Sequence, residues 1–384
     1  MTSSPPKALE RLNGLNLMRL VLASAVLLAH ALLVAGVPAL PHTDLGYWAV
    51  AGFFCISGYL VTRSADRLPT ATYLRHRAMR LLPAYWVCLV VTGVVIAPAA
   101  TSRLDLVDDG LVYVVANAGL LVTQSSVNGT PNVGHYPGEW NASLWTLSHE
   151  FACYLVVGAL VLTRAFRHAS WARWGLAWLV ATAAHVALLR LAPDAPFLVR
   201  GFVRLLPLFL GGAVVQAFRP LDQLRLRTGI TCLALGATVV LVQPAYGLQL
   251  CAPLLAYALL AIGLRLPCPR VIAREDVSYG TYLYAFPVTQ LMAYLCLPRG
   301  VWAVSAWVLT IFAITLGLAA LSWFLVEKKA LRWARRSLAA GHAVPAAPHG
   351  ARRTHEDGQR PAAPDVHTGA GSRSAGPSAR IDGA

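Results

Sequence analysis

Apolar stretches of about 20 residues recur along most of this 384-residue chain, and they limit its fold more than any other feature. An α-helix rises about 1.5 Å per residue, so such a stretch is long enough to cross the hydrocarbon core of a bilayer. Ten stretches of this kind are present, at about 15–37, 46–62, 82–100, 143–163, 174–191, 198–218, 229–243, 248–264, 278–297 and 302–326. The sequence therefore predicts an all-α, polytopic membrane protein, a bundle of about ten transmembrane helices.

The charge of the chain predicts its orientation in the membrane. Only 13% of the residues are charged, yet the net charge is +15. Basic residues concentrate in alternate loops, before residue 15 and at 63–80, 164–173, 219–227, 265–274 and 328–336. The intervening loops hold only Arg103 and Arg299. Because basic loops stay on the cytoplasmic side, we expect both termini to be cytoplasmic, and the charge does not indicate nucleic acid binding.

The chain is predicted to form one membrane domain. Residues 1–14 are a cytoplasmic lead-in, 15–338 form the transmembrane domain, and 339–384 are rich in Ala, Gly, Pro, Ser and Arg, which predicts a disordered cytoplasmic tail. The first apolar stretch follows basic residues as in a signal peptide, but it is too long for one. The Ala- and Arg-rich composition is typical of a high-GC bacterial genome, so the expected location is the bacterial inner membrane.

The first apolar stretch contains two ionisable residues, Arg19 and His30. Eleven residues separate them, which places both side chains within about 20° of one direction and about 16 Å apart along the helix. An ionisable residue inside a hydrocarbon span faces the bundle interior or a watery cavity and indicates a functional site. For His30 two explanations are open, a helix–helix hydrogen bond and catalysis.

Glu150 is the acidic residue that lies deep within a predicted span, at about the same predicted depth as His30. An imidazole can remove a hydroxyl proton near neutral pH, and a carboxylate can orient the ring and stabilise its cation. We therefore predict that His30 and Glu150 are catalytic. Candidate residues for binding the acceptor are Ser143, Trp145 and Arg204, of which Arg204 would counter Glu150 or hold a substrate oxygen.

The basic loop 63–80 ends in Arg77 and Arg80, three residues apart and just before Pro83. On a helix the two arginines share a face. Membrane orientation explains basic loops in general, whereas a cluster at a helix end suits a phosphate-bearing ligand, because guanidinium groups bind phosphate bidentately.

Several familiar sites are absent from the sequence. The His-to-Asp motif of soluble acyltransferases is missing, and His149-Glu150 lacks the second histidine of a zinc protease. No glycine-rich phosphate loop with its lysine is present. The seven cysteines contain no CxxC pair and are interpreted as small apolar core residues. No metal is therefore expected.

The chain resembles the acyltransferase-3 family of integral membrane O-acyltransferases over about residues 12–335. The motifs that carry the resemblance are Arg19-x10-His30, Phe53-Phe54-x-x-Ser57-Gly58, Arg77-x-x-Arg80-x-x-Pro83-x-Tyr85, Ser143-Leu-Trp145-x-Leu-x-x-Glu150, Asp276-x-Ser278-Tyr279 and Ser322-Trp323-x-x-Val326-Glu327-Lys328. Two departures stand out. The histidine that many members carry in the ninth span is replaced by the run Leu283-Tyr284-Ala285-Phe286, and Lys329 stands where a proline often closes the last motif.

The resemblance implies transfer of an acetyl or other short acyl group from cytoplasmic acyl-CoA to a hydroxyl. It also implies that Arg19, His30, Arg77, Arg80 and Glu150 are functional. We expect the three arginines to bind the acyl-CoA donor, with acetyl-CoA as the first choice. The family's ten-helix core agrees with the number of apolar stretches counted above.

The acceptor is expected to be a secondary metabolite of the macrolide type or a sugar, and an envelope glycan is the alternative. Direct transfer and a transient acyl-enzyme on His30 are both open. A transporter or flippase is the competing class of protein, but the paired broken helices of an inverted repeat are not evident in the sequence.

Overall fold

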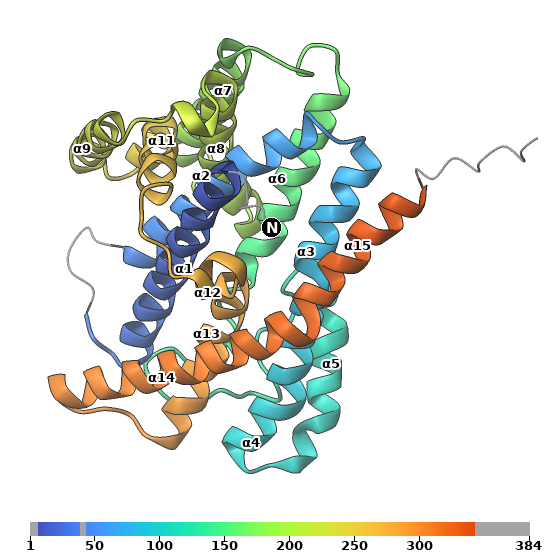
Figure 1. Ribbon diagram of the computed structural model, residues 1–384. Helices are drawn as coiled ribbons and strands as arrows, with labels where there is room; N and C mark the ends of the chain where they lie inside the picture. Colours follow the sequence, from blue (N-terminus) through green and yellow to red (C-terminus); the bar gives the residue numbers. More distant parts are fainter. Residues whose placement is uncertain (1–6, 39–43, 342–384) are drawn as a thin grey trace, which may run out of the picture. The chain divides into compact units, whose positions relative to one another are not determined.

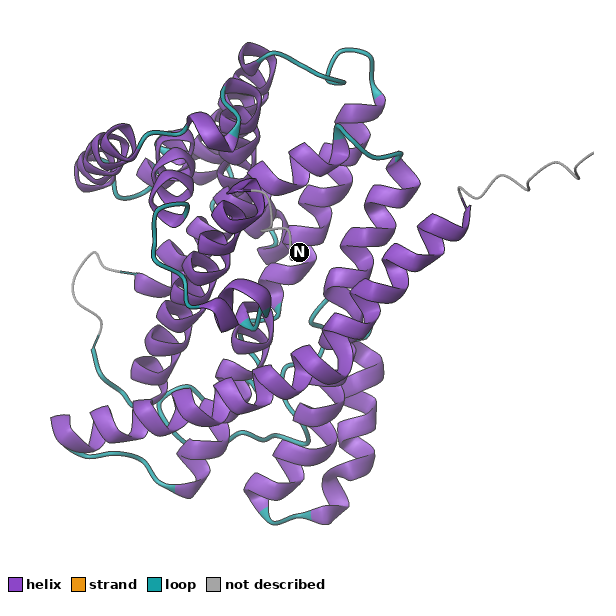
Figure 2. Cartoon of the chain, viewed as in Figure 1, coloured by secondary structure: helices purple, strands orange, loops and turns teal. Residues whose placement is uncertain are grey.

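The computed structural model describes residues 7–38 and 44–341, and within them every regular element is a helix, joined by loops (Figure 2). The one extended pairing in these ranges is an isolated bridge between Val127 and Thr130. The all-α prediction is confirmed. Of the predicted tail, only 339–341 fall within the described residues, where they end the last helix, and of the predicted lead-in, 7–14 are helical.

The elements follow one another in the order shown in Figure 1. They are α1 (Lys7–Val34), α2 (Leu45–Ala65), α3 (Thr70–Val90), the π-helical turn η1 (Val91–Ile96), α4 (Ala97–Thr101), η2 (Leu104–Leu106), α5 (Val107–Asn117), α6 (Trp145–Leu162), α7 (Trp171–Leu191), α8 (Phe197–Phe218), η3 (Leu221–Gln223), α9 (Leu226–Val242), α10 (Gly247–Leu250), α11 (Ala252–Gly263), α12 (Arg270–Arg274), α13 (Ser278–Leu295), α14 (Val301–Ser322), the π-helical turn η4 (Trp323–Glu327) and α15 (Lys328–Gly341).

Seven helices in the described residues are long and apolar enough to cross a membrane, taking each uninterrupted run of helical turns as one. They are Gly14–Val34, Leu45–Ala65, Thr70–Thr101, Trp145–Leu162, Trp171–Leu191, Phe197–Phe218 and Val301–Ala334. The helices Leu226–Val242 and Ala252–Gly263 are apolar but shorter. The count of ten spans and the cytoplasmic placement of both termini stay predictions.

The third span begins earlier than the hydropathy indicated. Helix α3 starts at Thr70 and runs through Pro83 without ending, so Arg77 and Arg80 lie inside a helix and not in a loop. Proline lacks only its own backbone donor, and neighbouring helices can compensate for that loss in a membrane protein. The expectation that the two arginines share a helical face is met by this longer helix.

Helix α1 lies at the centre of the arrangement that builds the site. It packs against α2 and α13, while α2 packs against α8 and α3 packs against α6 and α15. The contact between α2 and α8 depends on glycine, because a Cβ at Gly58 would collide with the backbone carbonyl of Phe209. Small residues let membrane helices approach closely. Gly58 therefore has a structural role in the close contact between α2 and α8.

The last helices form one continuous rod from Val301 to Gly341, drawn in orange to red in Figure 1. The rod is interrupted only by the π-helical turn Trp323–Glu327. Such turns insert one extra residue into a helix and often occur at functional sites. This turn ends on Glu327, a buried carboxylate.

Candidate active site

Three arginines predicted to bind the donor meet around one cavity of about 190 Å³. They come from helices far apart in the sequence, Arg19 from α1 and both Arg77 and Arg80 from α3. Glu150 of α6 lines the same cavity. Its wall is completed by Ser57, Leu60, Val61, His76, Leu81, Tyr154, Tyr279, Leu331 and Ala334. The structure thus brings together four of the five residues that the family resemblance marks as functional.

Asp276, in the short segment before α13, joins two of the arginines. Its Oδ2 accepts hydrogen bonds from Arg19 Nη1 at 2.6 Å and from Arg80 Nη2 at 2.5 Å. Its Oδ1 accepts from the hydroxyl and the backbone N–H of Ser278. Burial opposes ionisation of Asp276, but Arg19 and Arg80 outweigh it and hold the pKa of this carboxyl well below its usual range. Asp276 is therefore a charged clamp between α1 and α3.

Arg80 has a second carboxylate partner. Its Nη1 lies 3.4 Å from Oε2 of Glu327, whose side chain is 1% exposed. The other oxygen of Glu327 accepts a hydrogen bond from the hydroxyl of Ser322 at 3.2 Å. With Asp276 on one side and Glu327 on the other, the guanidinium of Arg80 is neutralised by the protein itself.

Arg77 differs from its two neighbours. Within residues 7–38 and 44–341 it makes no ion pair and no side-chain hydrogen bond, and its Nε is buried without a partner. The residue as a whole is half-buried, so the rest of its guanidinium can meet an anion that enters the cavity. Among the three arginines of the cavity, Arg77 is therefore the one whose charge no carboxylate of the described residues neutralises.

Glu150 lies where the first cavity meets a second, smaller one of about 30 Å³. Its Oε1 accepts hydrogen bonds from Ser57 Oγ at 2.9 Å and from the hydroxyl of Tyr154 at 2.6 Å. Arg19, Ser57, Glu150 and Tyr279 line both cavities. The second cavity adds Val50, Phe53, Phe54, Thr146, Leu147, Ser278 and Tyr282, so it continues between α2, α6 and α13.

His30 lies beyond the second cavity. Its ring packs edge-on against Phe286, with 4.9 Å between centroids, and Phe286 follows the cavity residue Tyr282 by one helical turn. The Nδ1 atom of His30 is buried without a hydrogen-bond partner. Within the described residues no hydrogen bond joins His30 to Glu150.

The expected match in depth between His30 and Glu150 is wrong. Glu150 shares its cavity with Arg19, which lies about 16 Å from His30 along α1. Hydropathy places a residue within its own helix, but the axial offset between two helices is decided by how they pack.

The three residues predicted to bind the acceptor do not line either cavity. Ser143 is buried, and its carbonyl accepts a hydrogen bond from the hydroxyl of Tyr282 at 3.0 Å. Trp145 packs against His149 and Phe197. The guanidinium of Arg204 stacks 3.5 Å above the ring centroid of Tyr47. No comparison tests their roles, which stay predictions.

Sequence reasoning assigned no role to Asp276, Glu327 or Ser57, although each stands in a quoted motif. For Asp276 and Glu327 the sequence offered one signal, an acidic residue at the boundary of a helix and close to basic residues in the sequence. Their partners are as far as 257 residues away along the chain, which no local pattern reveals. In the described ranges no group of three His, Cys, Asp or Glu side chains is arranged to hold a metal.

The fold and this site define an integral membrane protein with a charged cavity inside a helical bundle. The acyltransferase-domain model of the acyltransferase-3 family matches residues 12–327, so the chain belongs to that family. It is an O-acyltransferase and a multi-pass membrane protein.

Similar proteins come from a phage and from bacteria. The O-acetyl transferase of Shigella phage Sf6 is 28% identical over 84% of this chain and 97% of its own length. Nodulation protein 10 of Rhizobium leguminosarum bv. viciae is 28% identical over 83% of this chain and 93% of its own. Acyltransferase MdmB of Streptomyces mycarofaciens is 34% identical over 31% of this chain and 30% of its own. No solved structure matches the chain.

Proposed function

We propose that this protein transfers an acetyl or other short acyl group from acyl-CoA to a hydroxyl of a secondary metabolite or a sugar. The observation that carries the proposal is the arginine cavity, which holds one unpaired guanidinium and continues along α1 toward His30. Acetyl-CoA is the first donor to test, because the Shigella phage relative is described as an O-acetyl transferase.

Arg77 is assigned the main phosphate contact. Glu150 lines the cavity with the three arginines, and Asp276 and Glu327 pair with Arg19 and Arg80 behind its wall. The formal charges of these six groups cancel when all are ionised. The six groups at the cavity therefore supply no net positive charge of their own. A specific guanidinium without a partner attracts the donor instead, and charge-assisted bidentate hydrogen bonds to phosphate are its strongest available interaction. Arg19 and Arg80, fixed by Asp276, form the wall beside it.

The second cavity is assigned to the pantetheine arm of the donor. It begins beside Arg19 and ends one helical turn before the level of Phe286, the ring against which His30 packs. The separation of about 16 Å between Arg19 and His30 suits a long, narrow arm of this kind. Glu150 lines both cavities and can accept a hydrogen bond from an amide N–H of the arm.

His30 is assigned the proton transfer. Its unpartnered nitrogen accepts the proton of the acceptor hydroxyl as the oxygen attacks the thioester carbonyl. The C–S bond then breaks, the ester forms, and the proton passes from His30 to the departing CoA thiolate. The same residue can instead carry the acyl group for a short time, with the same overall balance.

The acceptor class is proposed with the relatives of this chain in view. The relatives include proteins of a phage, a nodulating bacterium and a Streptomyces, so their sources do not agree on one acceptor. We keep a secondary metabolite of the macrolide type first and an envelope glycan second, and we place the enzyme in a bacterial inner membrane.

The test uses membranes that contain the full chain, acetyl-CoA labelled in the acetyl group, and a panel of macrolide and sugar acceptors. We expect label in a hydroxyl ester of an acceptor, and no label when His30→Ala replaces the wild type. Uptake of an acceptor into sealed vesicles without any acyl transfer would instead identify a transporter.

A further inference from the structure

Helix α15 lies beyond residue 327, where the match to the family ends. Its sequence, Lys-Lys-Ala-Leu-Arg-Trp-Ala-Arg-Arg-Ser-Leu-Ala-Ala-Gly, contains five basic residues and no acidic one. The cavity and the reaction described above give no role to these charges. Lys328 belongs to the last family motif quoted above, and the other four are a property of this chain that the family motifs do not explain.

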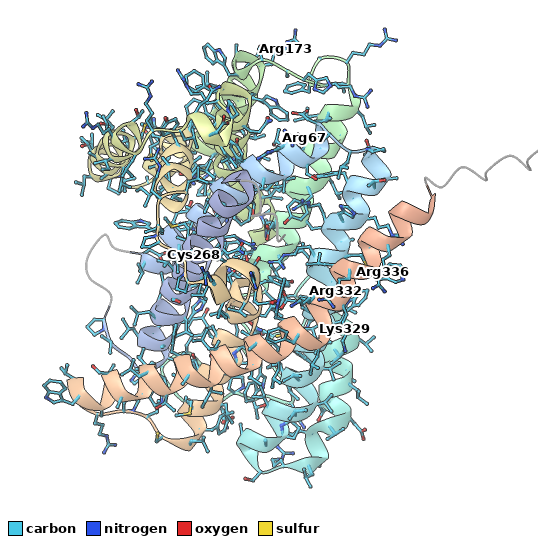
Figure 3. All side chains as sticks on the ribbon, viewed as in Figure 1. Arg67, Arg173, Cys268, Lys329, Arg332 and Arg336 are labelled. Atoms are coloured by element: carbon cyan, nitrogen blue, oxygen red, sulfur yellow. The ribbon has the colours of Figure 1, made fainter. Side chains whose placement is uncertain are left out.

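Three of the basic residues, Lys329, Arg332 and Arg336, form one exposed stripe. Their spacing of three and four residues puts them on one face of the helix. All three are exposed, and within the described residues none makes a hydrogen bond or an ion pair. Figure 3 shows them along α15. We call this set the α15 basic stripe.

The other side of α15 faces the protein. The helix packs against α3, and its residues Leu331 and Ala334 line the arginine cavity. Trp333 lies beside the stripe with 55% of its surface exposed, and the guanidinium of Arg75 stacks 4.6 Å from its ring centroid. The basic stripe is therefore turned away from the donor site and does not serve it.

The position of α15 in the chain points to the partner. Helix α14 is apolar and long enough to cross a bilayer, and α15 continues it without a loop. A basic helix directly after a membrane span, with a tryptophan beside its charged face, is suited to the headgroup layer. Clusters of Lys and Arg in this position attract anionic lipids, by about 1 kcal/mol for each charge near the surface.

We propose that the α15 basic stripe binds the headgroups of anionic phospholipids and so anchors one wall of the arginine cavity to the membrane surface. The charge complementarity is direct, since phosphate diesters accept hydrogen bonds from both Lys and Arg. Lipid is also the anionic partner that a helix continuing a membrane span meets first. This inference does not depend on the proposed acyl transfer.

The test follows the fluorescence of Trp333 in the full chain reconstituted into nanodiscs of phosphatidylcholine. Brominated phosphatidylglycerol is added in increasing proportion, and brominated phosphatidylcholine serves as the neutral comparison. The chain has eleven tryptophans, so the signal of Trp333 is taken as the difference between the wild type and Trp333→Phe. The test variant is K329Q/R332Q/R336Q, and the charge-matched control is R67Q/R225Q/R227Q.

We expect brominated phosphatidylglycerol to quench Trp333 at a lower proportion than brominated phosphatidylcholine does. The proportion needed for half quenching should rise by about fivefold for each charge removed, or about 100-fold for the test variant. The control variant should behave as the wild type does. Added salt should weaken the preference, because exposed charges are screened.

Equal quenching by the two lipids in the wild type would overturn the proposal. So would an unchanged preference in the test variant, or an equal loss in the control, since either outcome would make the stripe irrelevant. All of these outcomes are measured by fluorescence quenching and do not require acyl transfer. A chain that is inactive in the acyltransferase assay can therefore still confirm the lipid site.

Discussion

The apolar span Gly14–Val34 of α1 holds two ionisable residues, Arg19 near one end and His30 near the other, in opposite surroundings. Arg19 is paired at 2.6 Å with Oδ2 of Asp276, and the other oxygen of this carboxylate accepts two hydrogen bonds from Ser278. His30 is packed against Phe286, and its Nδ1 has no partner. The difference indicates a division of labour. Under the proposed function, the paired charges form a rigid wall for binding, and the Nδ1 of His30 is free to exchange a proton with the acceptor.

The largest effect is expected from the removal of His30. His30→Ala should lower kcat by about 10²- to 10⁴-fold, the usual contribution of a positioned general base. The lost ring contact with Phe286 should cost about 1 kcal/mol of stability, and no hydrogen bond to Nδ1 is lost. The measurement is the rate of label transfer from acetyl-CoA, with the thermal unfolding midpoint in detergent as the control. Full activity in a folded variant would remove His30 from the mechanism.

Asp276→Asn tests the ion pairs that hold Arg19 and Arg80. The change leaves Arg19 and Arg80 without their shared carboxylate in a largely buried site, so the variant should lose about 3 kcal/mol of stability. The thermal unfolding midpoint should fall clearly, and Asp105→Asn, in an exposed pair with Arg103, is the matched control with little expected change. A midpoint equal to the wild type would show that the clamp has no structural value.

The same clamp predicts a pH dependence. Arg19 and Arg80 hold the folded-state pKa of Asp276 below its unfolded value, which is about 3.9. The stability from this group is therefore complete above about pH 4 and is lost as the pH falls further. The gap in unfolding midpoint between wild type and Asp276→Asn should not narrow as the pH falls from 8 to 5, and it should narrow below pH 4. A gap that narrows between pH 8 and pH 6 would contradict the assignment.

Within the cavity, the unpaired Arg77 can be compared with the paired Arg19 and Arg80. Arg77→Gln should raise the KM for acetyl-CoA by about 10- to 100-fold with little effect on kcat, because a charge-assisted hydrogen bond contributes about 1.5 to 3 kcal/mol to binding. The control is Arg67→Gln, which removes the same charge from an exposed arginine just before α3. A fall in kcat at unchanged KM would assign Arg77 to the chemical step instead.

Ser57→Ala should have the smallest effect. It removes one of the two hydrogen bonds to Oε1 of Glu150 and leaves that of Tyr154, so a loss of about 1 kcal/mol is expected. In kinetics this corresponds to about a fivefold fall in kcat/KM. A complete loss of transfer would give Ser57 a direct part in the reaction.

Much of the fold could be predicted from the sequence, because a bilayer imposes a length and a polarity on each span that are visible residue by residue. The helical class and the shared face of Arg77 and Arg80 followed from these rules, and so did the position of Arg19 facing a cavity inside the bundle. The start of the third span did not follow, since a proline within a membrane helix does not end it. The relative depth of His30 and Glu150 also failed, because periodicity says nothing about the offset between helices.

The sequence by itself determined which helices form and which charged residues they carry into the membrane. Only the tertiary structure decided which of those charges are neutralised. Asp276 and Glu327 reach Arg80 from positions 196 and 247 residues away, and they leave Arg77 unpaired. The physical reason is that an ion pair depends on a separation of a few ångströms, which the packing of whole helices sets.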